Sequence, residues 1–213
     1  MILKPLKPRK ALNKAFLKVK PTRAEIDHFK ANLIRLLNRT VDTESEEFHK
    51  NLVSMFLRDT WYKPNHFINT KGRTDLVIHI GPDAKSHVGV IIEAKRPNNK
   101  AEMPSCEKIN TKAVQELVLY YMRERVLQNN LEIKHLIATD TYEWFIFDAT
   151  LFDRLFAQNK HFVQQYNDFA NGRLADSRTD FFYKQIAEPF IESITAEIEF
   201  AYFNLRDYLE PLR

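Results

Sequence analysis

A predicted β-hairpin reads Thr74-Asp75-Leu76-Val77-Ile78-His79-Ile80, then a turn signal at Gly81-Pro82-Asp83, then Val90-Ile91-Ile92-Glu93-Ala94-Lys95. Apolar, mostly β-branched residues fill both runs, a pattern typical of strands that are covered on both faces of a sheet. Two carboxylates and one ammonium group nevertheless stand at the strand ends, on Asp75, Glu93 and Lys95. Charges at such positions are rare without a partner or a chemical task.

The expected register of this hairpin brings the three charges together. If the hairpin is symmetric about Ala84, Asp75 lies directly opposite Glu93, with Cβ atoms about 4.5–5.5 Å apart. The strand period of two then places Glu93 and Lys95 on the same face as Asp75. Two close carboxylates repel each other unless a cation lies between them, and oxygen ligands suit Mg²⁺. The alternative is a solvated Glu–Lys ion pair, which the apolar flanks disfavour.

These residues resemble the PD-(D/E)xK nuclease superfamily, whose motif is an Asp on one strand and (Asp/Glu)-x-Lys on the next. More narrowly, residues 70–78 and 89–97 are similar to the N-terminal nuclease region of type IIG restriction–modification enzymes. Further similar segments extend the resemblance over about residues 40–213, and they include Gln115-Glu116-Leu117, His135-Leu136-Ile137, Glu143-Trp144-Phe145-Ile146-Phe147-Asp148-Ala149 and Ala201-Tyr202-Phe203-Asn204-Leu205-Arg206-Asp207-Tyr208. One departure is that Thr74, not Pro, precedes Asp75.

The resemblance implies a Mg²⁺-dependent endonuclease site. Asp75, Glu93 and the backbone carbonyl of Ala94 would hold the ion, for which Mn²⁺ would substitute. Lys95 would orient or deprotonate the attacking water and would offset negative charge that develops on the phosphate. A nearby metal should lower the pKa of Lys95 and the carboxylates should raise it, and the sequence leaves open which effect is larger.

Two further site residues follow from the same resemblance. A glutamate near the start of a helix expected at 45–59 joins the metal site in the superfamily, which implies Glu46, with Glu47 as the alternative. Three glutamates, Glu44, Glu46 and Glu47, lie at the start of this helix. Helix capping and the helix dipole are enough to explain at least two of them. Gln115 matches a Gln that related nucleases place near the lysine or a phosphate. The alternative is a Gln on the helix surface.

Basic residues beside the hairpin are the expected DNA contacts. Lys71 and Arg73 precede the first strand and Arg96 follows the second, so they would lie near the scissile phosphate. Residues 1–23 add eight Lys or Arg and no acidic residue. This segment is either an arm that neutralises phosphates or a solvated tail.

Composition limits the other classes of function. The chain has 213 residues, 44% of them hydrophobic, and a net charge of +4, which fits one core with helical extensions. The single cysteine, Cys106, excludes an internal disulfide and a multi-cysteine zinc site. Four glycines and no phosphate-binding glycine motif argue against a nucleotide cradle. Because no apolar run reaches membrane-spanning length, we expect a cytoplasmic protein without a membrane partner. The resemblance implies that it is prokaryotic.

Hydrophobic periodicity predicts an α/β protein, and the resemblance implies a three-layer, restriction-endonuclease-like fold. We expect a mixed central sheet of about four strands flanked by helices, and a helical C-terminal extension. The expected strands are 74–80, 87–95, 134–139 and 143–148. The expected helices are 23–39, 45–59, 111–128, 150–157, 160–170 and 180–208, the last interrupted near Pro189.

The predicted domain organisation has three parts. Residues 1–40 form a basic arm and first helix, 41–150 the nuclease core, and 151–213 a helical connector to a missing downstream domain. The expected partners are double-stranded DNA, missing methyltransferase and target-recognition domains of the same polypeptide or system, and a second copy in a transient dimer for double-strand cleavage. No methyltransferase motif of the Asn-Pro-Pro-Tyr type occurs.

Three functions compete at this point. The first is a Mg²⁺-dependent DNA endonuclease, a type II site-specific deoxyribonuclease that is the cleavage domain of a type IIG restriction–modification enzyme. The second is a catalytically silent DNA-binding module of the same fold. The third is a nuclease of another DNA pathway, such as a junction resolvase or transposition nuclease. Silent members usually lose the acid or the lysine, and this chain keeps Asp75, Glu93 and Lys95, which favours activity.

Overall fold

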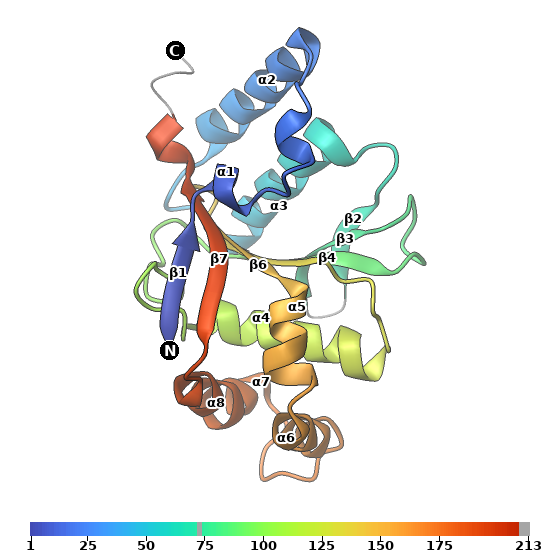
Figure 1. Ribbon diagram of the computed structural model, residues 1–213, viewed down its shortest axis with the longest axis vertical. Helices are drawn as coiled ribbons and strands as arrows, with labels where there is room; N and C mark the ends of the chain where they lie inside the picture. Colours follow the sequence, from blue (N-terminus) through green and yellow to red (C-terminus); the bar gives the residue numbers. More distant parts are fainter. Residues whose placement is uncertain (72–73, 209–213) are drawn as a thin grey trace.

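A seven-stranded mixed sheet forms the centre of the molecule (Figure 1). The computed structural model describes residues 1–71 and 74–208, except for the side chains of Lys71, Thr74 and Asp75. The strand order is β1-β7-β6-β5-β4-β3-β2. β1 pairs with β7 and β4 with β5 in parallel, and the other neighbours are antiparallel. The strands are β1 (Ile2–Leu6), β2 (Ile68–Lys71), β3 (Thr74–His79), β4 (Val88–Ala94), β5 (His135–Thr139), β6 (Glu143–Asp148) and β7 (Glu197–Asn204).

Helices connect and cover these strands. Several of them continue into a π-helical turn, and the helical stretch that includes α7 and α8 is unbroken from Thr179 to Ser193. The helices are α1 (Pro8–Ala11), α2 (Arg23–Arg39), α3 (Glu46–Leu57, continuing through Tyr62), α4 (Lys112–Met122, continuing through Leu127), α5 (Ala149–Phe152, continuing through Ala157), α6 (Lys160–Ala170), α7 (Thr179–Phe181) and α8 (Glu188–Ser193). Short 3₁₀ turns span Phe16–Lys18 and Leu205–Tyr208.

The helix starts agree with the capping chemistry of the sequence. The Thr22 hydroxyl accepts from the Glu25 amide at 3.2 Å, and the Glu25 carboxylate accepts from the Thr22 amide at 2.7 Å, which completes a capping box on α2. The Ser45 hydroxyl accepts from the amide of Phe48 at 3.1 Å and caps α3. The first of these caps fixes where α2 begins, and the second places Glu46 in the first turn of α3.

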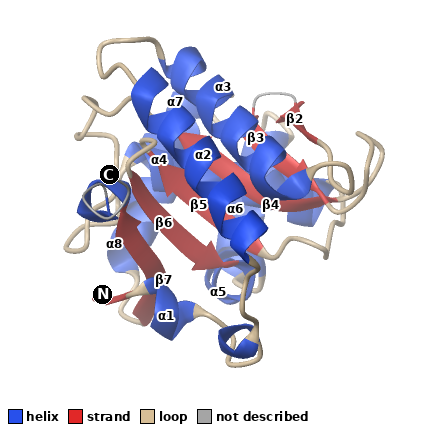
Figure 2. Ribbon diagram, turned by 90° about the horizontal axis from the view of Figure 1, so that it is seen from above, coloured by secondary structure: helices blue, strands red, loops and turns tan. Residues whose placement is uncertain are grey.

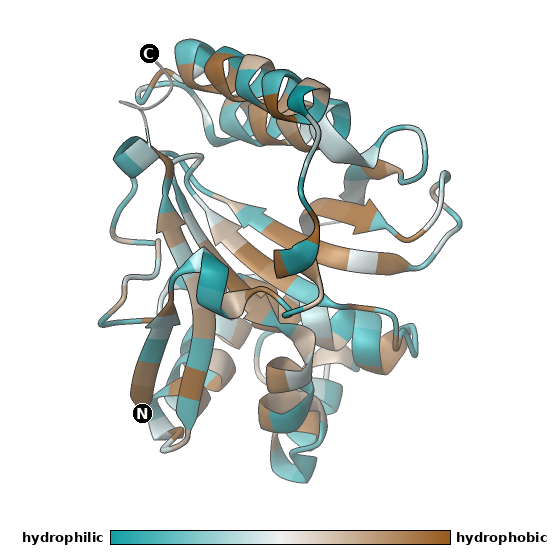
Figure 3. Ribbon diagram, turned by 45° about the horizontal axis from the view of Figure 1, so that its top comes forward, coloured by the Kyte–Doolittle hydropathy of each residue, from teal (hydrophilic) through white to brown (hydrophobic). Residues whose placement is uncertain are grey.

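Helices cover both faces of the sheet, as the apolar strands predict (Figure 2). Alternate residues of β3 separate the two layers: Leu76 and Ile78 pack with α2 and α3, whereas Val77 packs with α4 and the C-terminal helices. Figure 3 shows brown apolar residues along the central strands and brown residues alternating with teal hydrophilic ones along the helices. The expected α/β class and a mixed sheet flanked by helices are therefore confirmed.

The sheet is larger than expected, with seven strands instead of about four. The four predicted strands are β3, β4, β5 and β6, and β1, β2 and β7 were not predicted. The prediction of a helix over 180–208 is wrong after Ser193, because β7 occupies Glu197–Asn204. Its residues alternate between polar and apolar, with Ile198 and Phe200 buried, and this period of two is the signal of a half-buried strand.

The basic N-terminal segment is not a detached tail. Its first residues form β1, which pairs with β7 in parallel, with Ile2 opposite Glu197 and Leu6 opposite Ala201. The first few residues are therefore part of the sheet, and residues beyond Lys7 leave the sheet edge toward α2 (Figure 1). Removal of residues 1–20 would remove an edge strand together with the positive charge.

Candidate active site

The pairing of β3 with β4 follows the predicted register at the end that carries the charges. Leu76 lies opposite Ile92 and Val77 opposite Ile91, which is the hairpin symmetry about Ala84. Continued by one residue, this register places the backbone of Asp75 opposite that of Glu93. The side chain of Asp75 lies outside the described residues, so its contacts stay a prediction. A register shift between Ile78 and His79 affects only the turn end of the hairpin.

Lys95 is the centre of a buried ionic cluster. Its Nζ lies 2.6 Å from Glu93 Oε1 and 2.7 Å from Glu116 Oε2. The Lys95 side chain is 3% exposed, that of Glu93 1% and that of Glu116 10%. The amide of Lys95 donates to the carbonyl of Thr139 at 2.8 Å, which extends the pairing of β4 with β5 and fixes the backbone beneath the cluster. The solvated Glu–Lys pair is therefore excluded.

Charge in this cluster decides the protonation state of Lys95. Burial by itself lowers the pKa of Lys95, but the carboxylates of Glu93 and Glu116 outweigh burial and raise the pKa well above its ordinary value. The opposing effect of a nearby metal on this pKa stays a prediction. Lys95 is therefore an ammonium ion at neutral pH, suited to donate hydrogen bonds and offset negative charge rather than to remove a proton.

Two partly exposed glutamates border the cluster. Glu46 Oε1, from the first turn of α3, lies 3.5 Å from Lys95 Nζ, whereas the alternative, Glu47, pairs with Lys50. Glu102 Oε2 lies 3.8 Å from Lys95 Nζ, and its other oxygen lies 3.3 Å from Lys112 Nζ. The structure thus brings Glu46 to the site and adds Glu102, which the sequence analysis missed.

The helix after β4 contributes Glu116 rather than Gln115. The side-chain amide of Gln115 donates to Asn110 Oδ1 at 3.1 Å, and the Asn110 amide donates to the carbonyl of Glu188 at 3.0 Å. Successive helical residues point about 100° apart, so only one of the two neighbours can face Lys95. All ten residues from Ala113 to Met122 are buried, so the hydrophobic period of α4 does not show which residue faces Lys95. No other sequence signal identifies Glu116.

The donor chemistry of the cluster suits Mg²⁺, because the available ligands are carboxylate oxygens. The described side chains include no group of three His, Cys, Asp or Glu placed to hold a metal ion. Glu93 and Glu116 face Lys95 Nζ, and Asp75, the third expected carboxylate, lies outside the described side chains. Ala94 is buried on β4, and the role of its carbonyl as a ligand stays a prediction.

The expected DNA contacts are only partly visible. The side chain of Lys71 and the whole of Arg73 lie outside the described part of the chain. Arg96 is exposed directly after Lys95, so its guanidinium is available at the rim of the cluster. Lys112, at the first turn of α4, is a second basic group at this rim, with its side chain 41% exposed.

Comparison with known families identifies one relationship. A family described as "Domain of unknown function (DUF7149)" matches residues 6–213. The chain belongs to this DUF7149 family. The match includes β2 to β7 and every residue of the Lys95 cluster, and it assigns them no activity.

No curated protein and no solved structure matches the chain. Within the described residues, no helix is both long and apolar enough to cross a membrane.

Proposed function

We propose that this DUF7149 chain is a Mg²⁺-dependent DNA endonuclease, the cleavage domain of a type IIG restriction–modification enzyme that acts in a prokaryotic cytoplasm. The observation that carries the proposal is the buried Lys95 ammonium held by Glu93 and Glu116 at the end of β4. The predicted β3–β4 register, with Asp75 opposite Glu93, supports the same reading. A buried cluster of this kind costs desolvation energy and is a functional-site candidate.

The residues of the cluster have distinct tasks in this proposal. The Lys95 ammonium offsets the negative charge that develops on the scissile phosphate and orients the attacking water. Glu116 keeps Lys95 protonated and aimed, so it is a positioning residue. Glu46 sits at the more exposed side of the cluster, where substrate would enter. Hydrolysis breaks the P–O3′ bond, and the water oxygen stays on the phosphate.

Asp75 and Glu93, with the carbonyl of Ala94, are the residues that would hold a Mg²⁺ ion. Such an ion, when bound, polarises a phosphoryl oxygen and lowers the pKa of a bound water. Glu93 would then exchange part of its contact with Lys95 for the metal. Glu116 remains beside Lys95 in that event, which preserves the ammonium form.

The proposed substrate is double-stranded DNA, and its expected contacts are Arg96, Lys71 and Arg73. Target recognition and methylation would reside in other domains of the same polypeptide or system. Double-strand cleavage would need a second copy of the chain in a transient dimer, because one cluster holds one scissile phosphate.

Divalent metal should bind weakly to the isolated chain, because phosphate oxygens complete the coordination shell. Mn²⁺ and Mg²⁺ should support turnover. Ca²⁺ should bind without supporting turnover, because the ion is larger and its coordination geometry is looser. Titration calorimetry with Mn²⁺ on the wild type and on Asp75→Ala measures the difference, with Asp207→Ala as a surface carboxylate control. Equal binding by Asp75→Ala and the wild type would exclude Asp75 from the site.

Salt should weaken DNA binding steeply, because phosphate contacts release counterions. A triple variant, Lys14, Lys18 and Lys20 to Gln, keeps β1 intact and should reduce the slope of log K against log salt by up to about 3. A matched triple variant of exposed lysines outside the N-terminal segment, Lys134, Lys160 and Lys184 to Gln, removes the same charge and should leave the slope within about 1. Equal slopes for the two variants would make the N-terminal basic residues irrelevant to DNA.

The substrate class separates the proposal from a nuclease of another pathway. The chain with Mg²⁺ should nick linear duplex DNA at least as fast as a four-way junction of the same sequence. Hemimethylated and unmethylated duplexes should be cut alike by the isolated chain, since recognition lies elsewhere. Strong preference for the junction would contradict the restriction role and favour a resolvase.

A further inference from the structure

An aromatic groove lies at the far end of α3 from the Lys95 cluster. It has a volume of about 480 Å³ and runs between the start of α2 and the helical turn after α3. Its apolar lining comes from Pro21, Ile26, Phe29 and Trp61. Trp61 is unusually exposed for so large an apolar residue, at 55%. The groove therefore presents an open aromatic face to solvent.

The Trp61 ring is held in place from behind. Its centroid lies 5.5 Å from that of Phe29 and 5.4 Å from that of Phe56. The turn that carries Trp61 is also fixed to α2, since His28 Nε2 lies 2.8 Å from the carbonyl oxygen of Asp59 and the Asn32 amide donates to the same oxygen at 3.3 Å. A flat ring fixed in this way costs little ordering entropy when a ligand stacks on it.

The only carboxylate that lines the groove among the described residues is already engaged. Glu25 Oε2 accepts from the amide and the hydroxyl of Thr22 at 2.7 and 2.8 Å. These hydrogen bonds hold the carboxylate at the cap of α2, where it keeps its negative charge. A neutral base is therefore expected at the groove, and the phosphates are expected along the cationic residues before Thr22.

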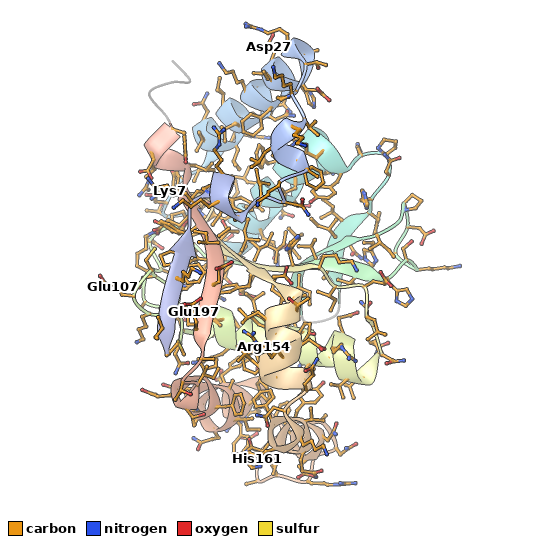
Figure 4. The ribbon with its side chains drawn as sticks, in the orientation of Figure 1. Lys7, Asp27, Glu107, Arg154, His161 and Glu197 are labelled. Carbon is orange, nitrogen blue, oxygen red and sulfur yellow. The ribbon has the colours of Figure 1, made fainter. Side chains whose placement is uncertain are left out.

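A basic strap leads to the groove. We use this name for residues 7–22, which leave the sheet edge near Lys7 and join α2, the helix that carries Asp27 (Figure 4). The strap holds six Lys or Arg and no acidic residue, and all residues from 9 to 28 are exposed. It also exposes Phe16 and Val19, at 66% and 67%. Cations interleaved with exposed apolar groups, ending at an aromatic platform, match the chemistry of single-stranded nucleic-acid binding.

We propose that the Trp61 groove and the basic strap bind an unpaired DNA strand, with a base stacked on Trp61 and phosphates along the strap. The choice of DNA over a protein rests on charge complementarity, because the strap is purely cationic. The inference rests on the proposed nuclease function only for its biological context, since binding at Trp61 needs no catalysis. It goes beyond that function by assigning a strand-binding site away from the cleavage centre.

The length of α3 sets the spacing between the two sites. Glu46 and Trp61 lie on one continuous helical stretch and are fifteen residues apart, which corresponds to about 22 Å along the axis. At 3.4 Å per nucleotide of a stacked strand, the groove lies on the order of six nucleotides from the cleavage centre. An unpaired strand shorter than this should not reach both.

Tryptophan fluorescence tests the site directly. The chain has two tryptophans, and Trp144 is buried at 4% exposure, so quenching by a nucleic acid reports Trp61. An oligo-dT of twelve nucleotides, titrated in EDTA to prevent cleavage, should quench the tryptophan emission of the wild type saturably. Trp61→Ala should lose the quenching and bind about fivefold to tenfold more weakly by anisotropy. Trp61→Phe, which keeps a ring, should lose the quenching but bind within about threefold of the wild type.

The outcomes separate this site from the nuclease. Oligo-dT binding in EDTA needs no cleavage, so a chain that fails to cut DNA can still support the groove. Lys184→Ala, an exposed lysine on a C-terminal helix, should bind oligo-dT as the wild type does. Unchanged oligo-dT affinity in folded Trp61→Ala would overturn the proposal. A blue shift of Trp61 emission with vesicles of anionic lipid, without quenching by oligo-dT, would overturn it in favour of a membrane surface. Stoichiometric binding of oligo-dT that leaves Trp61 emission unchanged would place the strand elsewhere.

Discussion

Replacing Lys95 with alanine should slow DNA nicking by about 10²- to 10³-fold or more, the loss seen when a charge-stabilising group is removed from an active site. The physical reason is that the Lys95 ammonium, held at 2.6 Å and 2.7 Å by two buried carboxylates, is placed to offset charge on the scissile phosphate. Asp75→Ala and Glu93→Ala should each cause a loss of similar size. Initial rates of supercoiled plasmid relaxation measure all three.

The three residues should behave as one unit. A Glu93→Ala, Lys95→Ala double variant should lose little beyond either single variant, because each removal already disables the site. Lys184→Ala, an exposed lysine on a C-terminal helix, serves as the matched control and should cut at the wild-type rate. Wild-type nicking by folded Lys95→Ala would remove this lysine from the mechanism.

Loss of Lys95 should also cost more folding stability than loss of either buried carboxylate. Removing the lysine leaves Glu93 and Glu116 without their shared cation, and breaking a buried pair in this way costs about 3–5 kcal/mol of unfolding free energy. Removing one glutamate costs less, because Lys95 keeps the other.

Urea denaturation of Lys95→Ala, Glu93→Ala and Glu116→Ala measures this asymmetry. Lys112→Ala is the control, because its side chain is 41% exposed and its loss should change stability by less than about 0.5 kcal/mol. The raised pKa of Lys95 gives a stability contribution that is complete below the unfolded pKa of about 10.4. The contribution fades only as pH rises through the higher folded pKa. The deficit of Lys95→Ala should therefore be constant from pH 6 to 9. A Glu93→Ala deficit equal to or larger than that of Lys95→Ala would contradict the shared-cation geometry.

The parts of the fold that local pattern determines were predictable. Thr22 and Ser45 mark helix starts through their own hydroxyls, and the apolar runs of β3 and β4 carry the strand signal in their composition. The register that pairs Leu76 with Ile92 was predictable from a hairpin that turns near Gly81-Pro82-Asp83. In each of these cases, the interacting residues are near one another in the sequence.

Other features depend on contacts that the sequence does not place. β1 and β7 pair although Ile2 and Glu197 are far apart in the chain, and β1 has too few residues to show a period. Glu116 faces Lys95 only because α4 is rotated by its packing, with apolar neighbours on every side. The β7 alternation from Glu197 was readable, but the helical pattern before it masked the change of period.

Metal-dependent nicking of plasmid DNA by the purified chain is the decisive measurement for a nuclease site at the end of β4. The chain should convert supercoiled plasmid to the open circular form with Mg²⁺, stop when EDTA is added, and resume when Mg²⁺ is restored in excess. Lys95→Ala, purified in parallel and shown by circular dichroism to be folded, should leave the plasmid supercoiled. Nicking that continues in EDTA, or that Lys95→Ala retains at the wild-type rate, would contradict a nuclease site at the end of β4.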